Sequence, residues 1–141
     1  MTGFKDLEPL EYFSSGVSKV CVAVGWLDRA MPYPTGPTDE RVFRRLKELL
    51  VDPFQPFAAT GSHGCNLCQF EPENRGANNL FVPSAGLLLV CPDLIAHYIN
   101  AHHYAPPLEF AEAVLSCPDT RTTEYRRSFL ASGGRALLNR K

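Results

Sequence analysis

The sequence predicts an α+β fold, with a small antiparallel sheet and several helices. Apolar segments with strand character stand at residues 17–28 and 86–92, and segments with apolar residues at helical spacing stand between and after them. The chain has 141 residues, which is enough to bury an apolar core without cross-links. We therefore expect a single domain over residues 1–141.

Residues 17–28 predict the first strand, because bulky and small side chains alternate along them. The bulky residues are Val20, Val22, Val24 and Trp26, and the small residues are Cys21, Ala23 and Gly25. Within this apolar alternation Cys21 is expected to be a small buried hydrophobe. Residues 31–38, which are rich in proline and glycine, predict the loop that follows.

A helix is predicted after this loop. Thr38 can cap it, and Pro53 ends it. Asp39 and Glu40 favour the first turn, because acidic side chains complement the positive end of the helix dipole. Apolar residues follow at helical spacing: Val42, Phe43, Leu46, Leu49 and Leu50.

The middle of the chain alternates between irregular and regular segments. Residues 53–85 are rich in proline, glycine and asparagine and are expected to be irregular. Residues 86–92 predict a second strand, and Pro92 favours the start of a helix directly after it. The apolar stripe of that helix consists of Leu94, Ile95, Tyr98 and Ile99.

Two further helices are predicted in the last third of the chain. Residues 105–107, APP, end the preceding helix and begin the next one, whose apolar face consists of Phe110, Ala111, Val114 and Leu115. A last helix is expected from Thr122 to Ser132, with Gly133 as its C-terminal stop. Its inward residues are Tyr125, Phe129 and Leu130.

Charge and hydropathy exclude several classes of protein. The formal net charge is -1, so no overall attraction to nucleic acid is expected. Basic residues gather in the C-terminal helix and tail, about residues 120–141, which we interpret as a solvated terminus, with an anionic partner as the alternative. No apolar run reaches the length of a membrane span, and residues 1–11 lack the pattern of a signal peptide. A cytoplasmic protein without membrane contact is the expectation.

Two short motifs predict a metal site in residues 60–117. Five cysteines in a reducing compartment, two of them in a Cys-x-x-Cys turn, indicate metal or redox use rather than disulfides. Zinc takes four nitrogen or sulfur ligands, commonly two from such a turn and two histidines from a helix. The predicted ligands of one structural zinc ion per chain are Cys65, Cys68, His97 and His102. Their type and order resemble a Cys2His2 zinc finger.

The spacing departs from that arrangement in two ways. The 28 residues between Cys68 and His97 exceed the usual insert of about 12. On an ideal helix His97 and His102 diverge by roughly 140°, so the final turn would have to tighten or unwind. His63 and His103 are therefore kept as alternative ligands.

The motifs favour a structural metal over a catalytic one. Two thiolates and two imidazoles close a tetrahedral site, whereas catalytic zinc keeps a position open. Among the available acids, Glu71, Glu73 and Glu109, none has a spacing that singles it out, so no catalytic residue is assigned. A thioredoxin-type redox pair is disfavoured because Pro72 and Gly76 follow the cysteines where a helix would be required.

Four segments of the chain resemble those of a known family. AVGWLD, GSHGCNLC, NLFVPSAG and PDLIAHYINAHHYAPPLEF resemble an uncharacterised bacterial family with a G-H-x-C-x-x-C segment and a later H-Y-[IV]-x-x-H-x-Y-x-P-P segment. The resemblance covers residues 20–117. It implies that His97 and His102 are the paired histidines and that His103 is not a ligand. It implies no established activity.

The expected function is that of a protein-interaction module, of a regulatory or immunity type, whose zinc positions a surface around residues 100–107, NAHHYAPP. Tyr98, Tyr104 and Phe110 could anchor a partner protein or belong to the core. A zinc-dependent hydrolase that uses an open position at the same site is the alternative. A nucleic-acid-binding zinc finger is the second alternative, disfavoured because the histidine-bearing helix carries no lysine or arginine.

Overall fold

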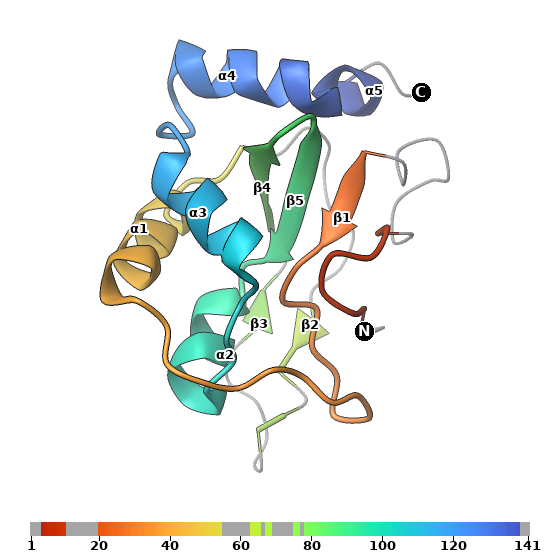
Figure 1. Cartoon of the computed structure of the whole chain (residues 1–141), viewed down its shortest axis with the longest axis vertical. Coiled ribbons are helices and arrows are strands. Elements are labelled where there is room, and N and C mark those ends of the chain that lie inside the picture. The colour runs from red at the N-terminus through yellow and green to blue at the C-terminus, as the bar shows by residue number, and fades with distance from the viewer. Residues whose placement is uncertain are drawn as a thin grey trace.

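A computed structural model describes six stretches of the chain. They are residues 4–10, 20–54, 63–65, 67–68, 75–76 and 78–138. Figure 1 shows a small sheet with helices on its faces and across its ends. The buried apolar side chains of the protein form a core that extends from the sheet to the surrounding helices.

The main sheet of the described chain has β5 (Leu87–Pro92) at its centre. β4 (Asn79–Ser84) pairs with it antiparallel on one side, and β1 (Cys21–Ala23) pairs with it parallel on the other (Figure 1). The α+β class is thus confirmed, but the sheet is mixed rather than wholly antiparallel. The parallel pair arises because a long crossover, which contains a helix, connects β1 to the rest of the sheet.

The prediction that residues 53–85 are irregular is wrong for β4. This strand forms a hairpin with β5 through a two-residue turn, in which Ala85 has φ 47° and Gly86 has φ 87°. Phe81 lies opposite Val90 across the pair, and both are buried. The strand carries Pro83, which is tolerated because β4 stands at the edge of the sheet.

β1 is shorter than the strand predicted over residues 17–28, of which residues 17–19 lie outside the described part. The strand ends at Ala23, and Gly25 then turns the chain with φ 75°. Trp26 then folds back so that its indole Nε1 donates a hydrogen bond of 2.8 Å to the Val90 carbonyl. Cys21 and Ala23 are fully buried, which confirms the expected environment of Cys21.

α1 (Glu40–Leu50) is the helix predicted after the first loop, but its cap differs. Asp39, and not Thr38, occupies the N-cap, where its side chain accepts the backbone N–H of Arg41 at 2.8 Å. The buried face consists of Val42, Leu46 and Leu49. The helix packs against the two helices that follow β5, which are α2 (Ile95–His102) and α3 (Leu108–Ser116).

α2 (Ile95–His102) and α3 (Leu108–Ser116) are separated by the predicted proline-containing break. α2 lies at one end of the sheet (Figure 1), and α3 packs on β4. Three aromatic side chains of this region, Tyr98, Tyr104 and Phe110, are 0% exposed. They belong to the core and do not form an exposed anchor for a partner.

The last helices cross the opposite end of the sheet (Figure 1). α4 (Thr123–Phe129) begins after Thr122, whose hydroxyl accepts the Tyr125 N–H, and a wide turn, η1 (Leu130–Gly134), leads into α5 (Arg135–Leu138). The Tyr125 hydroxyl donates to the Phe81 carbonyl at 2.6 Å and so fixes α4 on β4. α4 thus ends at Phe129, before the predicted end at Ser132, and the chain kinks at Ser132 and Gly133, where Gly133 has φ 98°. None of the described helices has both the length and the apolar character to cross a bilayer.

We predict that Gly25→Ala destabilises the protein more than Gly86→Ala. Both glycines have positive φ, so each alanine adds strain of about 1–2 kcal/mol. A Cβ at Gly25 would also lie 2.8 Å from Ile95 Cδ1 at the start of α2, whereas nothing lies within 4 Å of a Cβ at Gly86. The clash adds about 1–3 kcal/mol. Urea denaturation of both variants measures the difference, and equal losses would contradict the close approach of β1 and α2.

Candidate metal centre

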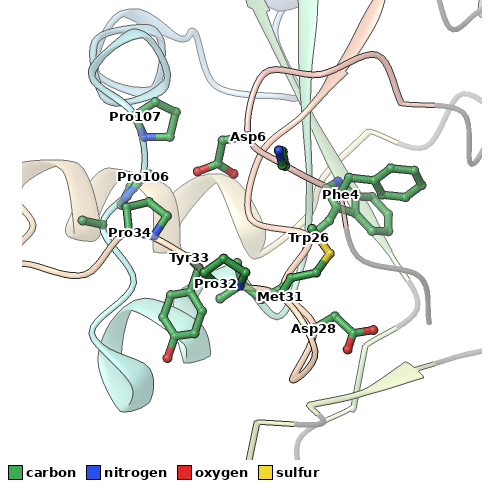
Figure 2. Close-up of a pocket in the computed structure, with 13 residues that line it drawn as sticks. Phe4, Asp6, Trp26, Asp28, Met31, Pro32, Tyr33, Pro34, Pro106 and Pro107 are labelled. Carbon is green, nitrogen blue, oxygen red and sulfur yellow. The ribbon is translucent and has the colours of Figure 1, made fainter.

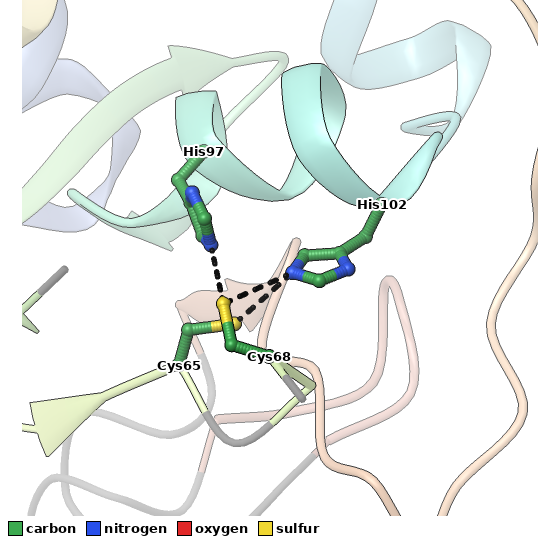
Figure 3. A group of neighbouring side chains, drawn as sticks. All are labelled: Cys65, Cys68, His97 and His102. Carbon is green, nitrogen blue, oxygen red and sulfur yellow. Dashed lines mark hydrogen bonds between the residues drawn. The ribbon is translucent and has the colours of Figure 1, made fainter. Parts of the chain in front are cut away.

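The structure brings the four predicted metal ligands together beneath α2 (Figure 3). The cysteines come from the segment that follows β2 (His63–Gly64), and the histidines come from the first and last turns of α2. The group consists of Cys65, Cys68, His97 and His102, and its donor atoms all lie within 4.8 Å of one another. Among the described residues, no carboxylate belongs to this group.

The distances between the donor atoms fit a tetrahedral metal. His102 Nε2 lies 3.3 Å from Cys65 Sγ and 3.6 Å from Cys68 Sγ, and Cys68 Sγ lies 3.3 Å from His97 Nε2 (Figure 3). Bonds of about 2.3 Å to sulfur and 2.0 Å to nitrogen at the tetrahedral angle place the two atoms about 3.5 Å apart. A thiol–imidazole hydrogen bond would explain one such contact. The approach of one nitrogen to both sulfurs is typical of a shared metal.

The end of α2 explains how two histidines five positions apart face one point. The N–H groups of His103 and Tyr104 both bond to the Tyr98 carbonyl, so the final turn is wider than an α-helical turn. A wider turn adds fewer degrees per residue, which brings His102 round toward the face that carries His97. The rings meet edge to face, with centroids 5.0 Å apart. This agrees with the expectation that the last turn must deviate from an ideal helix.

A short hairpin positions the cysteines. β2 pairs antiparallel with β3 (Arg75–Gly76), and Cys65 follows β2 directly. The backbone N–H groups of Leu67 and Cys68 act on the Cys65 thiol and lower its pKa, against the rise that burial causes. Such N–H donors stabilise a thiolate and fix the orientation of a metal ligand. Cys65 is fully buried, whereas Cys68 is half-buried.

The loop after β1 clamps the chain that leaves the metal site. The Tyr33 hydroxyl donates to the His102 carbonyl at 3.2 Å. The Gly36 N–H donates to the His103 carbonyl, and the Ala105 N–H donates to the Pro34 carbonyl, each at 3.0 Å. These three bonds satisfy backbone groups at the end of α2 that the helix leaves unpaired, and they hold His102 in place.

Burial favours the neutral form of three of the donors, Cys65, His97 and His102, before a metal binds. Burial lowers the pKa of His97 and of His102, and the neighbouring histidines lower that of His102 further. Burial raises the pKa of Cys65 despite its backbone donors, and the nearby Cys68 adds to the rise. Neutral imidazoles are the form that metals bind, and a metal that displaces the thiol protons would remove the cost of the buried thiolates.

The other candidate residues of the sequence lie elsewhere. His103 is exposed in a left-handed conformation, φ 57°, and is not part of the group. The side chain of His63, and Glu71 and Glu73, lie outside the described residues. Glu109 is exposed on α3. The remaining cysteines are buried apart from the site, at Cys21, Cys91 and Cys117.

Sequence reasoning missed two residues that support the site. Tyr33 contacts the metal-bearing segment through its hydroxyl, and Asp6 holds the buried Tyr104 through two oxygens at 2.8 Å. Neither residue stands in a motif. Their separation from His102 in the sequence is large, so only the folded chain reveals the connection.

The comparison with known proteins agrees with a family whose function is not assigned. Residues 2–115 match the model of a family described as a domain of unknown function (DUF7919). The matched range contains all four residues of the group and ends within α3. No curated protein and no solved structure matches the chain significantly.

We predict that Tyr33→Phe weakens zinc binding by up to about tenfold, because it removes the hydroxyl that holds the His102 carbonyl. Competition against a chromophoric chelator measures the affinity. The matched control is Tyr125→Phe, which removes a buried hydroxyl hydrogen bond near the other end of the sheet. The control should lower stability and leave zinc affinity unchanged. Unchanged affinity in Tyr33→Phe would contradict the role of the clamp.

We predict that the metal-free protein loses stability on acidification. Since burial lowers the folded-state pKa of both histidines, the unfolded chain binds more protons as the pH falls through the ordinary histidine value of about 6.5. The stability that the neutral histidines contribute is complete above a pH of about 6.5, and it is lost as the pH falls toward their lowered folded-state pKa. Denaturation of chelator-treated protein at several pH values measures it. The double variant His97→Gln with His102→Gln should show a weaker pH dependence than His103→Gln; equal dependence would contradict this account.

Proposed function

The chain belongs to the family described as a domain of unknown function (DUF7919), and we propose that it is a zinc-binding protein whose metal is structural and whose role is to bind another protein. The single observation that supports the metal most strongly is the convergence of four donor atoms within 4.8 Å. The choice of zinc follows from the donors. Two thiolates with two imidazoles in tetrahedral reach suit zinc, whereas magnesium and calcium require oxygen ligands.

The closed donor set supports a structural role. Four protein ligands complete a tetrahedron and leave no position for water or substrate. The surroundings of two of the ligands support the same conclusion, since backbone N–H groups act on the Cys65 thiol and the His102 carbonyl accepts the Tyr33 hydroxyl. The metal would join the pair of strands β2 and β3 to α2.

A role in binding protein is favoured over one in binding nucleic acid. α2 exposes Asn100 and Ala101 and carries no basic residue other than its histidines. Exposed arginines of the described chain include Arg126 and Arg127 on α4, which lies across the other end of the sheet from α2 (Figure 1). They also include Arg41 and Arg44 on α1, which pair with Asp39 and Glu40. Direct readout of bases would require amide or basic side chains on the metal-bearing helix. A cytoplasmic location suits the proposal, because two metal-binding thiolates need a reducing compartment.

We predict that His102→Asn loses zinc and that the neighbouring His103→Asn retains it. Asparagine tolerates the left-handed conformation of position 103, so the two substitutions differ mainly in their relation to the metal. Protein purified without added metal is assayed by elemental analysis and by denaturation. The free energy of unfolding should fall by at least about 2 kcal/mol in His102→Asn and by less than about 0.5 kcal/mol in His103→Asn. Equal zinc contents would contradict the proposal.

We predict that the metal site does not accept an additional ligand. Cobalt replaces zinc in such sites and gives a visible spectrum that depends on coordination. The cobalt form should show a tetrahedral spectrum that added azide or imidazole does not change. A spectrum that responds to these ligands in a saturable way would demonstrate an open position and would favour the zinc-dependent hydrolase instead.

A further inference from the structure

A pocket of about 510 Å³ is formed by the N-terminal segment, the loop after β1 and the loop between α2 and α3 (Figure 2). Its walls consist largely of aromatic and proline rings: Phe4, Trp26, Tyr33, Pro34, Pro106 and Pro107. Proline and aromatic rings lose little conformational freedom when a ligand binds. The pocket therefore offers a pre-formed apolar surface.

The carboxylate of Asp6 lies on the wall of this apolar pocket (Figure 2). It accepts the Tyr104 hydroxyl at 2.8 Å and the Gly25 N–H at 3.0 Å, which are both neutral donors. Within the described stretches, no basic side chain forms an ion pair with Asp6. Lys5 also lines the pocket, but it is an exposed residue. A partly buried carboxylate thus faces the pocket, and the hydrogen bonds that it accepts come from neutral groups.

A second carboxylate, that of Asp28, belongs to the same lining. Its Oδ1 accepts the Ala30 N–H at 2.9 Å, which fixes the turn that begins the loop. The charged groups of the lining are the two carboxylates of Asp6 and Asp28 and the single ammonium of Lys5, so the formal charge of the lining is negative. The rings around the carboxylates provide faces on which a planar cation can stack. A guanidinium group combines the charge, the planar shape and the weak hydration that suit these surroundings.

We propose that this pocket binds an arginine side chain presented by an extended segment of a partner protein. The proposal rests on the proposed protein-binding function and names the chemistry of the partner. The guanidinium would pair with Asp6 and stack on the aromatic wall. The volume exceeds that of one side chain, so residues on either side of the arginine have room to contact the proline rings at the rim.

The pocket and the metal site share a wall, which makes arginine binding depend on the metal. Tyr33 lines the pocket and donates its hydroxyl to the His102 carbonyl. Tyr104, which holds Asp6, stands two residues after His102 in the same clamped segment. Removal of the metal would release this segment and displace both the ring and the carboxylate. We therefore expect chelation to weaken arginine binding.

The test uses the full-length zinc-loaded protein and two capped amino acids. The probes are N-acetyl-arginine amide and N-acetyl-citrulline amide, which have similar shapes and differ in charge. The chain has a single tryptophan, Trp26, whose indole N–H gives one unambiguous signal from the pocket wall in nitrogen-labelled protein. The arginine probe should shift it saturably with a Kd on the order of millimolar, because one side chain buries little surface. The citrulline probe should not.

Variants identify the carboxylate responsible. Asp6→Asn retains an acceptor for Gly25 and should weaken arginine binding about tenfold, whereas Glu112→Gln, on the exposed face of α3, should leave it unchanged. If Asp6→Asn does not fold, Asp28→Asn keeps the turn acceptor and should weaken binding severalfold. Equal affinity for both probes, or full affinity in the folded carboxylate variants, would overturn the proposal.

Zinc content measured on the same samples separates this proposal from the proposed function. Absence of arginine binding in protein that holds one zinc per chain would overturn the pocket assignment and leave the structural metal standing. Arginine binding in protein that never contains zinc would support the pocket and count against the metal. Chelation that leaves arginine affinity unchanged would overturn the coupling between the two sites.

Discussion

The structure near α2 depends on the convergence of two thiols and two imidazoles on one point. These polar groups come from separate segments and are packed in contact, with His102 Nε2 within 3.6 Å of both sulfurs. Without a metal, these four side chains would interact only weakly with one another, and those interactions would offset little of the free-energy cost of burying them. A metal would replace these weak interactions with four strong bonds and would thereby link the cysteine segment to the helix.

Several local features follow from this convergence. The wide final turn of α2 and the left-handed His103 bring the second histidine toward the first. The chain then continues as a segment that is clamped to the loop after β1 and whose Tyr104 reaches Asp6. The N-terminal segment in turn bonds to β1, where the Ala23 N–H donates to the Glu8 carbonyl at 2.9 Å. One connected set of bonds thus runs from the metal site to the sheet.

Much of the site could be predicted from the sequence, because its ligands stand in short motifs with fixed chemistry. The Cys-x-x-Cys turn and the paired histidines were sufficient to choose the four residues that the fold brings together. The strand at residues 86–92 and the helices were also predictable, since their apolar residues recur at regular spacing. The observed N-cap of α1 is Asp39 and not the predicted Thr38, because both residues are good caps and the sequence alone does not choose between them.

The features that could not be predicted depend on contacts between distant segments. β4 was hidden by Pro83 and by a turn through Ala85, a residue that rarely adopts positive φ. The parallel pairing of β1 with β5 leaves no local signal, and neither do the contacts of Tyr33 and Asp6. Such interactions arise from the packing of the whole chain rather than from any single window of sequence.

X-ray absorption at the zinc edge, on protein purified without added metal, tests the central claim most directly. A structural Cys2His2 site predicts one zinc per chain, with two sulfur neighbours at about 2.3 Å and two imidazole nitrogens at about 2.0 Å. Protein without zinc, or a zinc ion surrounded by oxygen or nitrogen with fewer than two sulfur neighbours, would contradict the account.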